Sequence, residues 1–171
     1  MSGFDRVSIA LLVVSDRASS GAREDLCEPV IRSFLESRGL TLGRVSITAD
    51  EKDEIGRTLA QWADSGDYDL VLSAGGTGLS PRDVTPEATR PILDREIPGI
   101  PEAMRAASVK ISRNAVLSRG LAGMRGSVMI INLPGSPKAA VENLEAVLDA
   151  VLHGIAKAKG DPSDCAPHPG A

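Results

Sequence analysis

Aromatic side chains are scarce in this sequence. Phenylalanine occurs twice and tyrosine and tryptophan once each, so aromatic residues make up 2% of the 171 residues. Proteins that read single-stranded nucleic acid stack bases on such rings, and this chain offers few of them. The formal net charge of −4 and the pI near 5.2 also disfavour a broad electrostatic grip on nucleic acid. We therefore expect no nucleic-acid partner and a core built from aliphatic side chains.

Cysteine, histidine and long apolar runs are rare as well. Cys27 and Cys165 share no metal-ligand spacing and are expected to be reduced thiols. His153 and His168 have no cysteine or second histidine at a useful spacing, so we expect neither a histidine metal site nor a catalytic triad. No apolar stretch approaches the ~20 residues that span a bilayer, and no signal segment is recognisable. These absences predict a soluble, cytoplasmic protein that binds no membrane.

The length and the apolar content favour one domain. Hydrophobic residues make up 42% of the chain, and a domain near ~150 residues buries about 70% of its unfolded surface. We expect a single domain over residues 1–160. The segment 161–171 has too little apolar material to pack and is expected to be a flexible tail.

Strand and helix patterns alternate along the chain. Strands are expected at 6–16, 43–50 and 68–76 and from Ser127, and 'AVLSR' before the glycine-rich turn 'GLAGMRG' is interpreted as a short antiparallel strand. Helices are expected at 26–39 and 51–66, from an N-cap at Thr85, around Met104, and from an N-cap at Ser136. This order predicts an α/β fold, a three-layer α/β/α sandwich with a mostly parallel sheet and one antiparallel strand or hairpin.

Four polar segments follow the predicted strands, namely 'SDRASSG', 'TADE', 'GGTGLSPRD' and 'NLPGSP'. Ligands of such sheets bind beyond the carboxyl ends of the strands, so these segments are expected to form one pocket. 'SDRASSG' is equally well explained as a serine-rich N-cap region, and 'PGSP' either offers N–H groups to an anion or simply starts a helix. Lys138 either contacts a phosphate or is solvated.

The glycine loop at 75–78 matches neither the P-loop nor the dinucleotide-binding pattern. A tight turn alone would explain its glycines, but Arg82 and Asp83 directly after it favour a phosphate site, because bare backbone lets N–H groups approach an anion. Asp50 and Asp83 each follow a strand, and such a carboxylate pair suits Mg²⁺. Two alternatives stay open: Asp50 caps the next helix, and Asp83 forms a local turn or pairs with Arg82.

These motifs occur in an order and spacing that resemble the MogA/MoaB family of molybdopterin adenylyltransferases, which is related to the G domain of gephyrin. The resemblance rests on 'SDRASSG', 'TADE', 'GGTGLSPRDVTPEAT', 'MRAASV', 'AVLSR' and 'NLPGSPKA' and covers about the first 160 residues. It implies a three-layer domain, usually a homotrimer, that transfers AMP from Mg-ATP to the terminal phosphate of molybdopterin and releases pyrophosphate. The activated pterin then passes to a molybdenum-insertion protein.

The resemblance also implies roles for individual residues. Asp50 and Asp83 match the essential aspartates that position Mg-ATP and the acceptor phosphate, and they are the candidate catalytic residues and Mg²⁺ ligands. Further positions are implied to bind molybdopterin or ATP: Ser15, Asp16, Gly75, Gly76, Thr77, Gly78, Ser108, Ser118, Asn132, Pro134, Gly135 and Ser136. The sequence departs from the family after Asp25, where Leu26, Cys27 and Glu28 replace the usual glycine turn.

Three hypotheses follow from the sequence. The leading one is an enzyme that adenylylates molybdopterin, favoured by the presence of both Asp50 and Asp83. The second is a non-catalytic molybdopterin-binding or scaffolding module. The third, an unrelated nucleotide-binding α/β domain, would bind ATP without affinity for the pterin.

Overall fold

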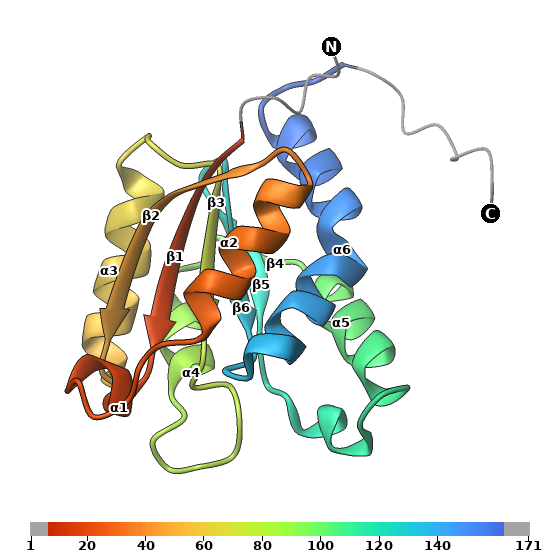
Figure 1. Ribbon diagram of the computed structural model, residues 1–171. Coiled ribbons are helices and arrows are strands. Elements are labelled where there is room, and N and C mark those ends of the chain that lie inside the picture. The colour runs from red at the N-terminus through yellow and green to blue at the C-terminus, as the bar shows by residue number, and fades with distance from the viewer. Residues whose placement is uncertain (1–6, 163–171) are drawn as a thin grey trace.

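A computed structural model describes residues 7–162 and shows one mixed sheet with helices on both faces (Figure 1). The strands are β1 (Ser8–Val14), β2 (Thr41–Thr48), β3 (Leu70–Ala74), β4 (Arg95–Glu96), β5 (Ala122–Arg125) and β6 (Val128–Leu133). The α-helices are α1 (Asp16–Ser19), α2 (Cys27–Ser37), α3 (Lys52–Asp64), α4 (Thr85–Thr89), α5 (Gly99–Val109) and α6 (Pro137–Ala158). Two 3₁₀ helices are η1 (Arg90–Ile92) and η2 (Arg113–Leu117).

The strands lie in the order β2-β1-β3-β6-β5-β4. The first four are mutually parallel, whereas β5 runs antiparallel to both β6 and β4. The chain moves from β1 to β2 on one side and then crosses to β3 on the other, so the strand order reverses between β1 and β3. The expected fold class, a mostly parallel sheet with an antiparallel hairpin, is confirmed.

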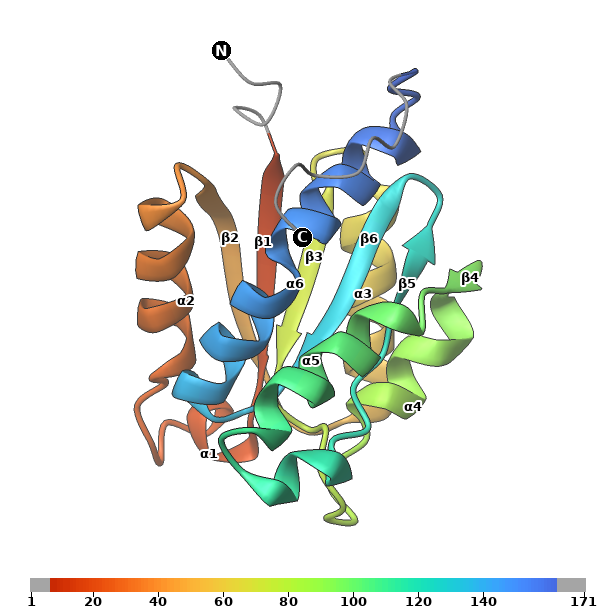
Figure 2. The same ribbon diagram turned by 90° about the vertical axis from the view of Figure 1, so that its right-hand side faces the viewer.

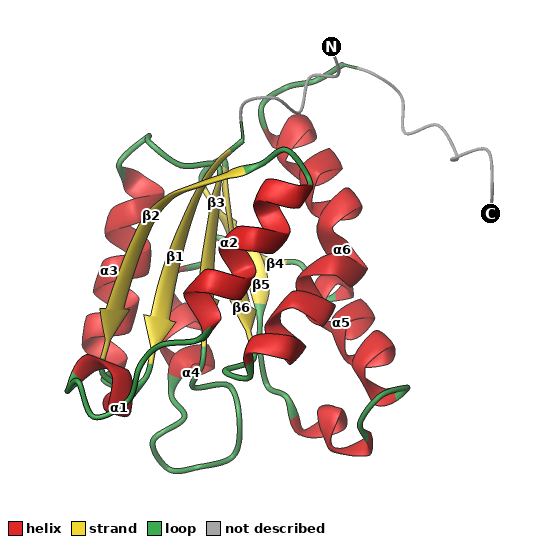
Figure 3. Cartoon of the chain, viewed as in Figure 1, coloured by secondary structure: helices red, strands yellow, loops and turns green. Residues whose placement is uncertain are grey.

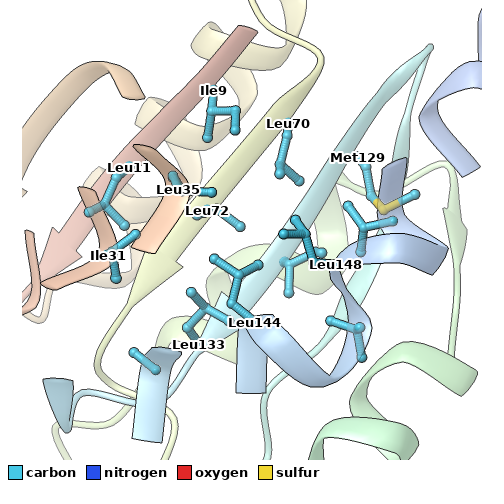
Figure 4. Close-up of a cluster of buried hydrophobic side chains, with 14 of the residues drawn as sticks. Ile9, Leu11, Ile31, Leu35, Leu70, Leu72, Met129, Leu133, Leu144 and Leu148 are labelled. Atoms are coloured by element: carbon cyan, nitrogen blue, oxygen red, sulfur yellow. The ribbon is translucent and has the colours of Figure 1, made fainter. Parts of the chain in front are cut away.

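The alternation of side chains along β1 divides the core into two layers. Ile9, Leu11 and Val13 pack with α2, α5 and α6 on one face, and Ala10 and Leu12 pack with α3 and α4 on the other. Figure 2 shows α2, α5 and α6 on one side of the sheet and α3 on the other. In Figure 4, leucines of α2 and α6 meet those of β1 and β3.

The short strand predicted at 'AVLSR' is wrong. Residues 113–117 form η2, with Val116 61% and Leu117 50% exposed, and the antiparallel strand β5 lies instead within 'GLAGMRG'. A Cβ on Gly123 would come within 2.6 Å of the backbone oxygen of Arg95. Glycine therefore marks a close approach between neighbouring strands here, although in the sequence it looked like a turn signal.

Two helix starts also differ from expectation. The N-cap of α4 is Val84, not Thr85, because the Thr85 hydroxyl donates instead to the backbone oxygen of Gly75 at 2.9 Å. Ser15, assigned to the end of the first strand, caps the extra helix α1 and accepts from the N–H of Ala18 at 3.2 Å. Most of the expected tail, 163–171, lies outside the described residues. No helix within 7–162 combines the length and apolarity of a membrane span.

Candidate active site

The four polar segments predicted to converge do meet at the carboxyl edge of the parallel strands, the lower end of the sheet in Figure 1. The N–H of Ser15 donates to the backbone oxygen of Thr48 at 2.9 Å, which joins the first segment to the end of β2. The N–H of Gly75 donates to the oxygen of Leu133 at 3.1 Å, which joins the glycine loop to the end of β6. The site therefore straddles the point where the strand order reverses.

The glycine loop adopts a conformation that only glycine tolerates well. Gly75 and Gly76 have φ of 113° and 63°. A Cβ on Gly75 would lie 2.1 Å from the oxygen of Val14, and one on Gly76 would lie 2.3 Å from the Thr85 hydroxyl and 3.1 Å from Asp50 Oδ1. Figure 3 shows the long loop that leads from this point to α4. The glycines thus bring bare backbone beside the Asp50 carboxylate.

Asp16 and Asp50 hold each other through reciprocal hydrogen bonds. The N–H of Asp16 donates to Asp50 Oδ2 at 2.9 Å, and the N–H of Asp50 donates to Asp16 Oδ1 at 3.0 Å. The N-cap of α3 is Glu51, and no side chain caps that helix. The alternative in which Asp50 caps the following helix is therefore wrong, and Asp50 instead joins the ends of β1 and β2.

Arg82 pairs with Asp16 and Glu51, not with its neighbour Asp83. Its guanidinium donates to both Asp16 oxygens at 3.0 and 2.9 Å and to Glu51 Oε1 at 2.8 Å. Arg82 thereby lowers the pKa of the Asp16 carboxyl. Burial raises the pKa of Asp50, and the negative charges of Asp16 and Asp83 act in the same direction. One carboxylate of the site is neutralised by the protein, whereas Asp50 carries a charge that its surroundings disfavour.

Asp83 forms a local turn, as one of the sequence alternatives proposed. Its N–H donates to the oxygen of Ser80 at 2.9 Å, and its Oδ2 accepts from the N–H of Ser80 at 2.8 Å. A Cβ on Gly78 would lie 2.8 Å from Asp83 Oδ2, so Gly78 leaves the space that this carboxylate occupies.

Sequence reasoning missed Arg119, which holds the glycine loop in place through hydrogen bonds to its backbone. Its Nε donates to the oxygen of Gly78 and its Nη2 to the oxygen of Asp83, both at 2.7 Å, and its Nη1 pairs with Glu87. The N–H of Arg119 also donates to the oxygen of Thr77 at 3.0 Å. The arginine ends the quoted motif 'AVLSR', but nothing in the sequence indicated which backbone atoms it would contact.

Two cavities open on either side of the glycine loop. The α5-side cavity, about 410 Å³, lies against α5, η2 and the start of α6. The α1-side cavity, about 210 Å³, lies against the ends of β1 and β3 and the loop 23–27. Gly76, Asp83 and Gly135 line both cavities, so these three residues form a shared wall.

The predicted site residues divide between these cavities. Ser15, Asp50 and Gly75 line only the α1-side cavity. Thr77, Gly78, Ser108, Ser118 and Pro134 line only the α5-side cavity.

Three predicted site residues line neither cavity: Asp16, Asn132 and Ser136. Asn132 is 1% exposed, and its Nδ2 donates to the hydroxyls of Ser73 at 3.0 Å and Thr89 at 2.9 Å. Its Oδ1 accepts from the N–H of Leu121 at 3.1 Å. These bonds tie β6 to β3, α4 and the approach to β5, so the side chain supports the loops from beneath.

Two charged or polar residues at the start of α6 face solvent. Ser136 is its N-cap but makes no side-chain capping bond. Lys138 has an 80% exposed side chain and lies 3.7 Å from Glu142, which matches the solvated alternative.

The departure after Asp25 starts a helix. The carboxylate of Asp25 accepts from the N–H groups of Cys27 at 2.9 Å and Glu28 at 3.0 Å, so it caps α2 without a glycine turn. Leu26 and Cys27 line the α1-side cavity. The Cys27 thiol donates to the oxygen of Gly135 at 3.3 Å, and burial raises its pKa to about 11.

The carboxylates of the site do not by themselves form a metal cage. Among the described residues, no group of three or more His, Cys, Asp or Glu side chains is arranged to hold a metal ion. Asp50 and Asp83 both line the α1-side cavity, and a divalent cation there would complete its coordination with water or phosphate oxygens.

Comparison with known proteins agrees with this geometry. Residues 10–154 match the family described as probable molybdopterin binding domain. The chain is 44% identical over 147 residues to a molybdopterin adenylyltransferase of Helicobacter pylori, covering 85% of this chain and 84% of that protein. It is 42% identical over 153 residues to the molybdopterin adenylyltransferase of Escherichia coli K12, covering 86% and 78%. The crystal structure of the molybdopterin biosynthesis enzyme MoaB of Thermus thermophilus superposes with a TM-score of 0.86 at 44% identity, covering 93% and 100%.

Proposed function

Because the chain belongs to the family of probable molybdopterin binding domains, we propose that it is a nucleotidyltransferase of molybdenum cofactor biosynthesis. It adenylylates molybdopterin with ATP and releases pyrophosphate. One observation carries this proposal beyond the family: two cavities meet at a wall of glycine backbone and the Asp83 carboxylate. A transfer between two phosphorylated substrates needs such a junction, because the reacting phosphates must approach each other while the organic parts stay apart.

The reaction requires no nucleophilic side chain. An oxygen of the molybdopterin phosphate attacks the α-phosphorus of ATP, the new P–O bond forms, and the bond to the β-phosphate oxygen breaks as pyrophosphate leaves. The protein must hold the two anions in line and offset their repulsion. Gly76 and Gly135 line both cavities and so can offer backbone to a phosphate from either side, and Arg119 fixes the glycine loop through Gly78 and Asp83.

We further propose that Asp50 and Asp83 hold Mg²⁺ when ATP is bound. The fit rests on charge: burial and the charges of Asp16 and Asp83 raise the pKa of Asp50 against a smaller opposing effect of Arg82, whose ion pair is with Asp16 and not with Asp50 or Asp83. A cation would relieve this excess negative charge. When bound, Mg²⁺ neutralises phosphate charge that develops during transfer. Asp16 keeps Asp50 in place through the reciprocal bonds between the N–H of each residue and the carboxylate of the other, and Arg82 in turn holds the Asp16 carboxylate.

The alternative, a binding or scaffolding module, is less well supported. The relatives at 42% and 44% identity are named molybdopterin adenylyltransferases, and this chain keeps both aspartates at the cavity junction. The finer features of the proposal follow the family resemblance. They are one domain over residues 1–160, a homotrimer in the cytoplasm, and transfer of the activated pterin to a molybdenum-insertion protein.

The test is a product assay. Purified protein is incubated with molybdopterin, ATP and Mg²⁺, and adenylylated pterin is followed by mass spectrometry beside Asp83→Asn. The matched control is Asp67→Asn, which removes an exposed carboxylate at the opposite end of the sheet, before β3. We expect product from the wild type and the control and at least about 100-fold less from Asp83→Asn. Pterin bound by a folded, ATP-competent wild type without any product would instead support the binding module.

A further inference from the structure

The α5-side cavity contains one cationic side chain. Among the described residues that line it, Arg105 is the only lysine or arginine, and it accompanies the carboxylates Asp83 and Glu142. Arg105 is partly buried on α5. It also lines a neighbouring cavity of about 520 Å³ between α4 and α5, so its side chain stands in the wall between two open spaces.

Arg105 lacks the partners that other arginines of this region have. Arg82 pairs with Asp16 and Glu51, Arg90 with Glu96, and Arg119 with Glu87. Within residues 7–162, Arg105 forms no ion pair, and its one hydrogen bond runs from Nη1 to the oxygen of Ser118 at 3.3 Å. A guanidinium carries five N–H donors in a planar fork, so most of its donors find no acceptor in the protein.

Two serines line the same cavity as this guanidinium. Ser108 follows Arg105 by three positions on α5, so both side chains project from the same face of that helix. Ser108 Oγ accepts from Asn143 Nδ2 at 2.6 Å, which leaves its own hydrogen free to donate. Ser118, whose backbone oxygen fixes Arg105, lines the cavity as well. One cavity thus combines a fork of donors with two serines, which is chemistry that binds a phosphate.

We propose that Arg105 binds a phosphate group of the substrate that occupies the α5-side cavity. The inference rests on the proposed function, which brings two phosphorylated substrates to the glycine loop, and it adds a residue that neither the glycine loop nor the two aspartates supply. The cavity reaches from Arg105 to Asp83 and Gly76, so a substrate held there can extend to the junction. The bound group is either a phosphate of ATP or the phosphate monoester of molybdopterin, and direct binding distinguishes the two sources.

The experiment is isothermal titration calorimetry with three separate ligands: inorganic pyrophosphate, ATP and molybdopterin. The proteins are the wild type, Arg105→Met, Arg105→Lys and the control Arg57→Met. Arg57 is exposed on α3, on the other face of the sheet, and its loss removes the same charge from the chain. A thermal melt of each variant accompanies the titrations.

We expect Arg105→Met to weaken binding of at least one ligand by about 10-fold or more, which is typical for losing a charge-assisted hydrogen bond. The lysine variant should fall between, because it keeps the charge and loses the fork. Arg57→Met should match the wild type. Weaker binding of pyrophosphate and ATP assigns Arg105 to the nucleotide, and weaker binding of molybdopterin alone assigns it to the pterin phosphate.

Unchanged affinity of Arg105→Met for all three ligands would overturn the inference while leaving the proposed function intact. If the methionine variant does not fold, a folded Arg105→Gln takes its place, and wild-type affinity of that variant for every ligand would overturn the inference equally. If instead the wild type binds these ligands through Arg105 but makes no adenylylated pterin, the inference stands and the proposed function fails.

Discussion

Replacing Gly75 by alanine should damage both the stability and the activity of the protein. A Cβ at this position would lie 2.1 Å from the backbone oxygen of Val14. A carbon and a carbonyl oxygen in contact normally lie about 3.3 Å or more apart, so either the loop or the end of β1 must move by about 1 Å. The oxygen belongs to a buried strand that pairs on both sides, so the loop is expected to move.

The cost has two parts. A non-glycine residue at a φ of 113° is strained by about 1–3 kcal/mol. Overpacking against fixed backbone adds about 1–3 kcal/mol. The sum of about 2–6 kcal/mol is a large share of the roughly 5–15 kcal/mol by which typical domains are stable. A shift of about 1 Å in groups that position reacting phosphates costs about 100-fold in rate.

Two other glycines separate these contributions. Gly21 has a φ of 73° but no atom within 4 Å of an added Cβ, so Gly21→Ala should cost only the backbone strain, about 1 kcal/mol. Gly99, at the first residue of α5, has neither a positive φ nor a close neighbour, so Gly99→Ala should be neutral or slightly stabilising.

The assay is urea unfolding followed by circular dichroism at one fixed protein concentration, with adenylylated pterin measured on the folded proteins. The expected order of stability is Gly99→Ala, wild type, Gly21→Ala and then Gly75→Ala, with the activity loss confined to the last. If Gly75→Ala proved as stable and as active as Gly21→Ala, the close approach of this loop to β1 would not constrain the site, and the reasoning would be refuted.

Three further perturbations test other parts of the site. Asp50→Asn should fold with equal or greater stability, because burial disfavours the charge that the substitution removes. The same variant should form about 100-fold less product or even less than that. Full activity of Asp50→Asn would contradict a role for the charge of Asp50. Lysine lacks the planar fork with which Arg119 bonds the backbone oxygens of Gly78 and Asp83 together. In Arg119→Lys, kcat/KM should therefore fall about 10-fold, and the amide hydrogens of the glycine loop should exchange faster. Unchanged amide exchange would contradict the role of Arg119 in holding this loop. Burial raises the pKa of Cys27 to about 11, whereas the thiol of the unfolded protein has a pKa near 9.0. In a Cys165→Ser background, iodoacetamide should therefore label the folded protein about 100-fold more slowly at pH 8 than the urea-unfolded protein. Equal labelling rates would contradict the burial of this thiol. The same shift contributes stability below pH 9.0 that is lost as the pH rises through about 11, because the unfolded thiol then ionises first, and urea unfolding at pH 8 and pH 11 would detect it.

Much of the fold follows from local patterns. The run 'IALLVV' is buried on both faces, which is why it lacks polar alternation and predicts a central parallel strand. The face formed by Ile55, Leu59 and Trp62 predicted α3, because its apolar residues recur at helical spacing. The antiparallel strand was misplaced for a tertiary reason. Gly123 is required by the backbone of β4, and no residue near it in sequence reports that contact.

The location of the site could be predicted from the sequence, whereas its detailed contacts could not. Topology alone brings the ends of parallel strands together, so the four loops could be expected to converge. Which atoms then bond depends on side-chain reach across the loops. Asn132 was predicted to contact the substrate. In the structure both polar atoms of its side chain form hydrogen bonds within the protein, and its contact to substrate stays a prediction. Arg119 could not be assigned because its acceptors are backbone oxygens, which every residue has.

Arg82 and Asp83 are neighbours in sequence, but their side chains contact different residues. Side by side they suggest an ion pair that would cancel both charges. In the structure the guanidinium of Arg82 donates to Asp16, whereas the carboxylate of Asp83 accepts from the N–H of Ser80. The arginine therefore neutralises Asp16, and no ion pair within residues 7–162 neutralises Asp50 or Asp83 at the α1-side cavity. These two charges repel phosphates, and a cation that enters with the substrate would offset that repulsion, as we propose for Mg²⁺. Omission of Mg²⁺ should then weaken ATP binding in the wild type and much less in Asp50→Asn, and titration calorimetry with and without the metal would decide it.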